Sequence, residues 1–306
     1  MEKKTTRKRG CLYWLKLGLV GLAGFYVGYF VLAIYSVTVP NPRTVCCATP
    51  ADDGFEFEEV TLTSPDEVTI AGWYIPSQNG AAVILLHGYD ATRLGVLPQA
   101  LMLARAGYGT LLIDMRGHGE SSPVVRSMGW ADVVDVATAV TWLQSRGDVN
   151  PDRIGIYGFS LGGQVALRAA AQLEAIQAVA GDGASLANNK DTPPLRSSFE
   201  HVLRFGNGIV YQGVAWRTGL PQPEAIIDTI ADISPRALFL IAAGEPEEME
   251  PRIVQFFYDH AQEPKTIWFI PETGHGGGPK VRPEEYADRL VSFSDDALLA
   301  GNLGSE

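Results

Sequence analysis

After about residue 54, hydrophobic and polar positions follow two alternating periods. Phe55–Thr63 and Glu67–Ile75 alternate apolar and polar residues on either side of the turn residues 64–66, which predicts an antiparallel hairpin. The later apolar runs are short, as in central strands buried on both faces. They are Ala82–Leu86, Thr110–Ile113, Ile154–Tyr157, Ile176–Ala180, Ala237–Ala242 and Thr266–Ile270.

Helical periodicity fills the gaps between these runs. Val133, Ala137, Val140 and Leu143 share one face of a helix over Trp130–Ser145, for example. The other predicted helices are Leu94–Ala106, Leu161–Leu173, Pro251–Ala261 and Glu284–Leu299. Strand–helix alternation predicts an α/β fold whose mostly parallel sheet is covered on both faces.

Residues 185–233 interrupt this alternation. They carry two adjacent prolines and several aromatic residues, and a bare loop of that length is improbable in a compact domain. We therefore expect a small cap inserted between two core strands, within a globular domain that covers residues 54–306.

The N-terminus has a different pattern. Residues 1–16 hold six basic residues and one acid, and Leu17–Val39 then runs for 23 residues without a charge. A helix of that length spans about 35 Å, enough to cross a bilayer core of about 30 Å. We expect a basic cytoplasmic tail (1–16), a transmembrane anchor (17–39) and a linker (40–53), with the globular domain extracytoplasmic. The alternatives are a cleaved signal peptide and a soluble helix.

Composition narrows the function further. The chain is 46% hydrophobic and 19% charged, which is typical of a folded protein. Its formal net charge of −11 counts against a nucleic-acid partner, because phosphate neutralisation needs a basic surface. Three cysteines cannot form a disulfide framework, and no metal or organic cofactor is expected.

One motif suggests a nucleophile. Gly158-Phe-Ser160-Leu-Gly162 follows an apolar strand and opens an Ala-rich helix. A serine in that position lies on a sharp turn, where the flanking glycines remove side chains that would clash. Its hydroxyl is then exposed at the helix N-terminus, which favours developing negative charge. Ser160 is the predicted nucleophile, and the alternative is a strand–helix turn without chemistry.

A serine nucleophile needs a base, usually a histidine held by a carboxylate. His275 directly follows the last predicted strand, so it lies at the same sheet edge as Ser160 and is the predicted base. His87 and His118 are expected to shape loops. His201 and His260 are expected to have surface or packing roles.

The carboxylate is less clearly marked. Four glutamates crowd the loop 244–251 after the strand Ala237–Ala242. The spacing from Gly244 and Pro251 favours Glu247, followed by Glu245 and Glu248. Asp182, at the end of the preceding strand, is a further alternative.

The oxyanion of an acyl-transfer reaction also needs donors. The backbone N–H of the residue after the nucleophile and an N–H from a loop after an early strand form the usual pair. Leu161 and Tyr89 occupy these positions, and Gly88 frees the backbone to turn. We predict that these two N–H groups form the oxyanion hole.

Taken together, the motifs resemble the α/β-hydrolase superfamily, close to its serine-aminopeptidase-like and dienelactone-hydrolase-like bacterial serine hydrolases. They are His87-Gly88, Asp114-x-Arg116-Gly-His-Gly-x-Ser121, Gly158-x-Ser160-x-Gly162, an acid and His275, in that order. The resemblance covers about residues 55–300. It implies an eight-stranded sheet and a triad of Ser160, Glu247 and His275. Glu247 departs from the family pattern, which usually has Asp there.

The predicted function is that of a membrane-anchored serine hydrolase. It would cleave a small-molecule carboxylic ester, or else a thioester or amide, through an acyl-serine intermediate. The alternatives are a catalytically silent, membrane-tethered binding module and a serine peptidase.

Overall fold

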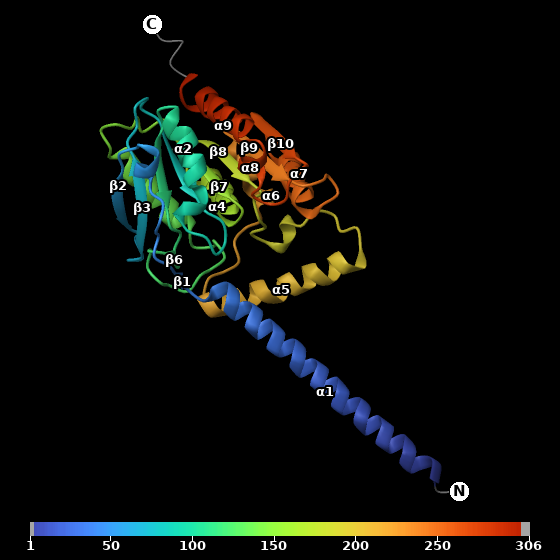
Figure 1. The fold of residues 1–306 in the computed structure, drawn as a ribbon. Coiled ribbons are helices and arrows are strands. Elements are labelled where there is room, and N and C mark those ends of the chain that lie inside the picture. Colours follow the sequence, from blue (N-terminus) through green and yellow to red (C-terminus); the bar gives the residue numbers. More distant parts are fainter. Residues whose placement is uncertain (1–2, 301–306) are drawn as a thin grey trace.

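The computed structural model describes the backbone of residues 3–300 and the side chains of residues 13–300 (Figure 1). Most basic side chains of the predicted tail 1–16 lie outside the described residues, as do residues 301–306 of the predicted domain. The strands are β1 (Asn41–Pro42), β2 (Glu58–Thr63), β3 (Thr69–Ile75), β4 (Ala82–Leu86), β5 (Gly109–Ile113), β6 (His118–Gly119), β7 (Ile154–Phe159), β8 (Ile176–Asp182), β9 (Ala237–Ala243) and β10 (Lys265–Ile270).

The helices alternate with these strands. They are α1 (Lys3–Thr38), α2 (Leu97–Arg105), α3 (Val133–Gln144), α4 (Leu161–Gln172), α5 (Ser198–Thr218), α6 (Ile226–Thr229), α7 (Met249–His260), α8 (Gly278–Val281) and α9 (Pro283–Leu298). Four short 3-10 helices are η1 (Pro50–Asp53), η2 (Arg93–Val96), η3 (Asn189–Asp191) and η4 (Ile230–Ile233).

Eight strands form one sheet in the order β10-β9-β8-β7-β4-β5-β3-β2. The pairings are parallel except for β2 with β3 and β3 with β5. The predicted mostly parallel, eight-stranded α/β fold is confirmed, and so is the antiparallel hairpin. Because parallel strands share a direction, β4, β7, β8, β9 and β10 all end at one edge.

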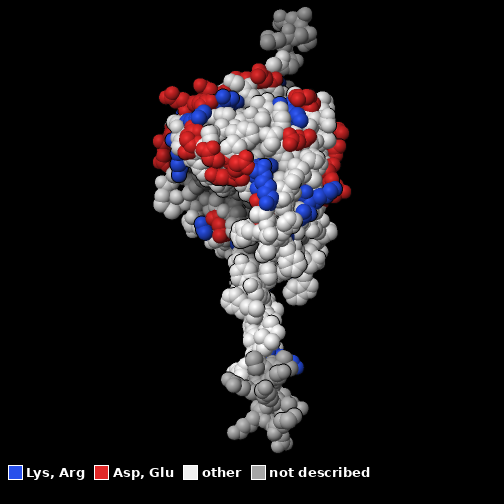
Figure 2. Space-filling model, turned by 90° about the vertical axis from the view of Figure 1, so that its right-hand side faces the viewer, with Lys and Arg blue, Asp and Glu red and all other residues white. Residues whose placement is uncertain are grey.

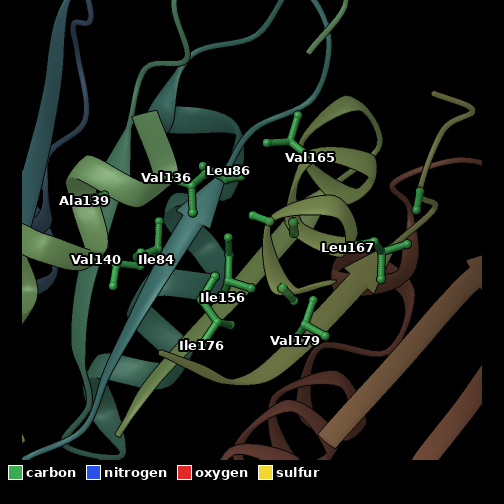
Figure 3. Close-up of a cluster of buried hydrophobic side chains, with 14 of the residues drawn as sticks. Ile84, Leu86, Val136, Ala139, Val140, Ile156, Val165, Leu167, Ile176 and Val179 are labelled. Carbon is green, nitrogen blue, oxygen red and sulfur yellow. The ribbon is translucent and has the colours of Figure 1, made fainter. Parts of the chain in front are cut away.

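Both faces of the sheet are buried. In β4, Ile84 and Leu86 face a core built with α3, α4 and α7, whereas Val83 and Leu85 face a second core built with α2 and α9. Figure 3 shows part of the first core, where Ile84 and Leu86 meet side chains of α3 and α4. Burial on both faces explains why the central strands are apolar throughout.

The segment 40–53 is not a free linker, because β1 pairs with β6 in parallel. The Asn41 N–H donates to the Gly117 carbonyl at 2.8 Å, and the Arg43 N–H donates to the Gly119 carbonyl at 2.8 Å. The chain that leaves α1 is therefore fastened to the domain at once. Sequence periodicity could not indicate this, since a two-residue strand has no measurable period.

Residues 183–236 connect β8 to β9 and contain α5, the longest helix of the domain apart from α1. This helix lies beside the C-terminal end of α1 (Figure 1). Tyr211 and Val214 of α5 are buried against Trp130 of the core domain. The insertion is thus attached both to α1 and to the domain.

Candidate active site

Ser160 lies between the end of β7 and the start of α4, in a strained backbone conformation. Its φ is 53° and its ψ is −110°, a combination that non-glycine residues rarely adopt. Its N–H donates to the Asp182 carbonyl at 2.8 Å, and its carbonyl accepts from the Ser185 N–H at 3.1 Å. Neighbouring backbone therefore holds the turn and leaves the side chain at the edge of the sheet.

The turn requires the two flanking glycines. A Cβ at Gly158 would lie 2.1 Å from the Gly162 carbonyl oxygen, and a Cβ at Gly162 would lie 2.3 Å from the Leu86 carbonyl oxygen. Both clashes are with backbone, which cannot move aside. The Gly-x-Ser-x-Gly pattern is therefore a steric condition for this geometry.

His275 follows β10 and lies at the same edge as Ser160. Its ring packs against the ring of Phe159, with centroids 4.7 Å apart. A Cβ at Gly183, which follows the Asp182 carbonyl that anchors Ser160, would lie 2.8 Å from the His275 ring. The tertiary structure thus brings the imidazole near the serine, and no hydrogen bond joins the two side chains among the described residues.

The carboxylate that holds His275 belongs to Glu250. Its Oε2 lies 2.6 Å from His275 Nδ1, and its Oε1 accepts the Ala243 N–H at 2.8 Å. Glu250 therefore bridges the end of β9 and the imidazole. With a carboxylate at Nδ1, the favoured tautomer carries its proton there and leaves Nε2 free to accept one.

The prediction of Glu247 for this position is wrong. Its side chain is 81% exposed and pairs with Arg196. The Glu248 N–H donates to the Glu245 carbonyl at 2.9 Å, so the chain turns before α7 and Glu247 points outward. Glu250 lies instead in the first turn of α7, directly before Pro251. Because α7 begins at Met249, two residues before Pro251, the proline did not mark the start of the helix or single out Glu250.

The other proposed acids do not contact the imidazole either. Glu245 and Glu248 are exposed and make no hydrogen bond to His275 among the described residues. Asp182 is buried and accepts hydrogen bonds from Tyr157 at 3.0 Å and Tyr286 at 2.8 Å. Burial raises the pKa of Asp182 to about 6. This network supports the turn beneath Ser160 and was not visible in the sequence, because its members lie far apart along the chain.

The Glu250 hydrogen bond raises the pKa of His275 above its usual value of 6.5, although partial burial acts in the opposite direction. The His275 side chain is 47% exposed and that of Glu250 is 19% exposed. A base with a raised pKa accepts a proton more readily, which suits a group that must take one from a hydroxyl.

Two backbone donors lie close to the serine. Leu161 is the first residue of α4, and Tyr89 follows the end of β4. Neither N–H has a hydrogen-bond acceptor within residues 3–300. A Cβ at Gly88 would lie 3.4 Å from Ser160 Cβ, so the peptide between Gly88 and Tyr89 approaches the nucleophile. Both predicted oxyanion donors are therefore near Ser160 and unpaired in the described part of the chain.

His87 fixes the orientation of that peptide. Its Nε2 accepts the Met115 N–H at 3.0 Å, so its Nδ1 carries the proton and donates to the Gly88 carbonyl at 2.7 Å. The Gly88 carbonyl belongs to the same peptide plane as the Tyr89 N–H. Burial lowers the pKa of His87 to about 4, which keeps the ring neutral.

The Asp114–Ser121 motif is structural. Asp114 accepts the backbone N–H groups of Arg93 at 2.7 Å and Glu120 at 2.9 Å, and Ser121 Oγ donates to the Asp114 carbonyl at 2.6 Å. These bonds hold the turn after β5. Among the described residues, no group of three or more His, Cys, Asp or Glu side chains could hold a metal ion.

Two cavities flank the cap. One of about 740 Å³ is lined by Trp130, Arg168 and Arg217, among others, and includes neither Ser160 nor His275. The other, of about 320 Å³, lies between Pro194 and α7 and reaches Pro251, next to Glu250.

Comparison with known proteins places the fold among known hydrolases. A family model described as X-Pro dipeptidyl-peptidase (S15 family) matches residues 57–192. An esterase of Pyrococcus furiosus has the same fold, with a TM-score of 0.68 and 26% identity over 85% of this chain and 98% of the esterase. The chain is a member of the α/β-hydrolase superfamily.

Relatives by sequence include two further proteins. The uncharacterized protein YfhR of Escherichia coli O157:H7 is 27% identical over 287 residues, covering 89% of this chain and 94% of YfhR. Thiohydrolase aneE of Aspergillus aculeatus is 31% identical over 118 residues, which are 37% of each chain. These findings support a hydrolase. Within this superfamily, the elbow at Ser160 is the expected place for a nucleophile.

Proposed function

We propose that this α/β hydrolase is a membrane-anchored serine hydrolase that cleaves small-molecule carboxylic esters or thioesters. Ser160 Oγ attacks the acyl carbon while its proton passes to His275 Nε2. The protonated imidazole then gives that proton to the leaving alkoxide or thiolate. Water, deprotonated by His275, hydrolyses the acyl-serine and restores the hydroxyl. Glu250 stabilises the imidazolium, and the N–H groups of Tyr89 and Leu161 hold the oxyanion.

The observation that carries this proposal is the local arrangement around Ser160. The strained turn leaves its hydroxyl beside two N–H donors that have no acceptor in the described part of the chain, and a histidine paired with a carboxylate lies at the same edge. A purely structural turn needs neither the donors nor the pair. The esterase and thiohydrolase relatives favour an acyl substrate.

The test is covalent labelling with a fluorophosphonate, which reacts only with an activated serine. We expect labelling of the full chain and turnover of a short p-nitrophenyl ester, both abolished in Ser160→Ala. The matched control is Ser145→Ala, since Ser145 caps α3 on the surface. Labelling that survives in Ser160→Ala would refute the proposal.

A peptidase is the second candidate, because the S15 family match covers the elbow. A panel that compares p-nitrophenyl esters with an X-Pro p-nitroanilide decides between the two. Ester turnover at least tenfold above anilide turnover favours the esterase, whereas the reverse ranking favours the peptidase.

The anchor is proposed for α1. Within its segment Tyr13–Thr38, the most apolar 18-residue window has a mean hydropathy of 2.1 and contains no buried residue. A cleaved signal peptide would pass the same test, but the end of α1 is built into the domain. The Ser36 carbonyl accepts hydrogen bonds from Tyr89 Oη at 2.9 Å and Arg126 at 2.9 Å, and the Thr38 carbonyl accepts the Arg126 N–H at 2.9 Å.

Removal of α1 would leave the buried Arg126 guanidinium without one of its acceptors, which favours retention of the helix. We expect the mature chain to keep its full mass and to stay in the membrane pellet during alkaline carbonate extraction. A mature chain shortened by about forty residues would show that the segment is a signal peptide.

A further inference from the structure

The helix α5 carries an uncovered apolar stripe next to α1. Val202, Phe205 and Trp216 are 66%, 71% and 86% exposed. Together with the half-buried Ile209, they recur at intervals of three, four and seven residues, so they lie on one side of the helix. Contiguous exposed apolar side chains of this size mark a surface that another apolar body covers.

The same helix touches α1 at a definite depth. A Cβ at Gly213 would lie 2.2 Å from the Ile34 side chain, and a Cβ at Gly206 would lie 3.8 Å from Phe30. At 1.5 Å per residue, Ile34 and Phe30 lie about 6 Å and about 12 Å before the end of α1 at Thr38. Glycines at both contacts allow the two helices to approach closely.

If α1 spans the membrane, the contacts of α5 with Phe30 and Ile34 lie inside the bilayer. Lys16 is the last charged residue before the apolar stretch, and a hydrocarbon core of about 30 Å takes about 20 residues from there, to Ser36. Phe30 and Ile34 then lie within the outer part of that core. A helix packed on both of them reaches the boundary between acyl chains and headgroups.

The charge distribution agrees with this placement. In the view of Figure 2, acidic side chains gather on the part of the domain remote from α1, and the surface nearest α1 is mostly uncharged. Beyond the basic tail, the chain has a net charge of −16, which an anionic lipid surface would repel. Keeping the acids away from the α1 side reduces that repulsion.

From these observations we infer that α5 is an interfacial helix, whose Val202–Trp216 stripe lies in the outer lipid leaflet beside α1. The inference rests on the proposed anchor. It gives the cap a lipid surface as its partner. Tyr211 of α5 donates to the Leu186 carbonyl at 3.4 Å. The neighbouring Ser185 N–H donates to the Ser160 carbonyl, so α5 is connected to the backbone around the nucleophile.

The test uses the full chain in phosphatidylcholine vesicles with or without bromine on the acyl chains, since bromine quenches tryptophan on contact. The tryptophan fluorescence contributed by Trp216 is the difference in emission between the parent and Trp216→Phe. We expect brominated lipid to reduce this contribution at least threefold. The matched control is Trp142→Phe, because the Trp142 ring packs on Tyr74 within the domain and its contribution should stay unchanged.

The outcomes separate the inference from the function on which it rests. A chain that leaves the vesicles in carbonate refutes the anchor, and the inference with it. A chain that is retained while the Trp216 contribution is not quenched refutes the interfacial helix alone. Crosslinking of two copies through α5, together with an unquenched Trp216, would assign the stripe to a second copy and also overturn the inference. The same quenching in Ser160→Ala shows that it does not depend on catalysis.

Discussion

Substitution of Glu250 by glutamine is the sharpest test of the site, because glutamine keeps the size of the side chain and removes its charge. In the parent, Glu250 Oε1 accepts the Ala243 N–H at 2.8 Å. The amide oxygen of glutamine can still accept this hydrogen bond, so the start of α7 should keep its position. The amide nitrogen then faces His275 Nδ1, where a carboxylate oxygen lies at 2.6 Å. An amide that donates there moves the imidazole proton to Nε2, the nitrogen that must accept the serine proton.

The expected fall in kcat follows from the loss of the charged hydrogen bond to His275 and from the change of imidazole tautomer. A hydrogen bond to a charged group is worth about 1.5–3 kcal/mol, with the lower half appropriate for a half-exposed histidine. That lower half, about 1.5–2.25 kcal/mol, corresponds to about 13- to 45-fold in rate. The wrong tautomer costs more, and loss of the orienting carboxylate from a catalytic triad can reduce kcat by about 10⁴. We therefore expect kcat to fall by about 10²- to 10⁴-fold.

The assay is kcat for a p-nitrophenyl ester as a function of pH, with Glu247→Gln as the matched control. Glu247 is 81% exposed and pairs only with Arg196 among the described residues, so its variant should keep kcat within about twofold. Because Glu250 raises the pKa of His275, the acid limb of the parent profile should lie above pH 6.5 and move to lower pH in Glu250→Gln. Equal losses in the two variants would refute the assignment of Glu250.

Other predictions concern the supports of the site. In His87→Phe, the peptide that carries the Tyr89 N–H loses its anchor, and kcat should fall at least about tenfold with KM near that of the parent. Gly162→Ala should destabilise the fold by about 1–3 kcal/mol in urea unfolding, whereas Gly147→Ala, which meets nothing within 4 Å, should not. Because the folded-state pKa of Asp182 is about 6, above its unfolded value, the folded chain holds a proton that the unfolded chain releases between about pH 4 and 6. Stability should therefore fall as pH rises through that window, and Asp182→Asn should show a smaller fall; an equal fall would argue against this carboxyl.

Most of the fold could be predicted from the sequence. Strands buried on both faces must be apolar throughout, and β4, with both faces in a core, is an example. The turn at Ser160 was predictable for a similar reason, since the atoms that exclude a side chain at Gly158 belong to the same turn. Such constraints act between residues that are close together in the sequence, so the sequence alone is enough to predict them.

The acid could not be chosen in this way. Glu247 and Glu250 are three residues apart in a loop of four glutamates, and their spacing from Gly244 and Pro251 does not show which carboxylate meets the imidazole. The choice depends on where α7 begins and on the Ala243 N–H, which binds Glu250. A shift of one residue in the start of a helix rotates a side chain by about 100°.

Local periodicity and steric exclusion, which need only neighbouring residues, therefore determined the strands of the main sheet, the larger helices that cover it and the nucleophile turn. The tertiary structure alone decided that Glu250 faces His275, that Tyr157 and Tyr286 hold Asp182, and that the end of α1 joins the Tyr89 loop. Each of these contacts depends on the relative placement of segments far apart in the chain. Hydrogen bonds require donor and acceptor to lie within a few tenths of an ångström of the right position, and only the packed fold defines that position.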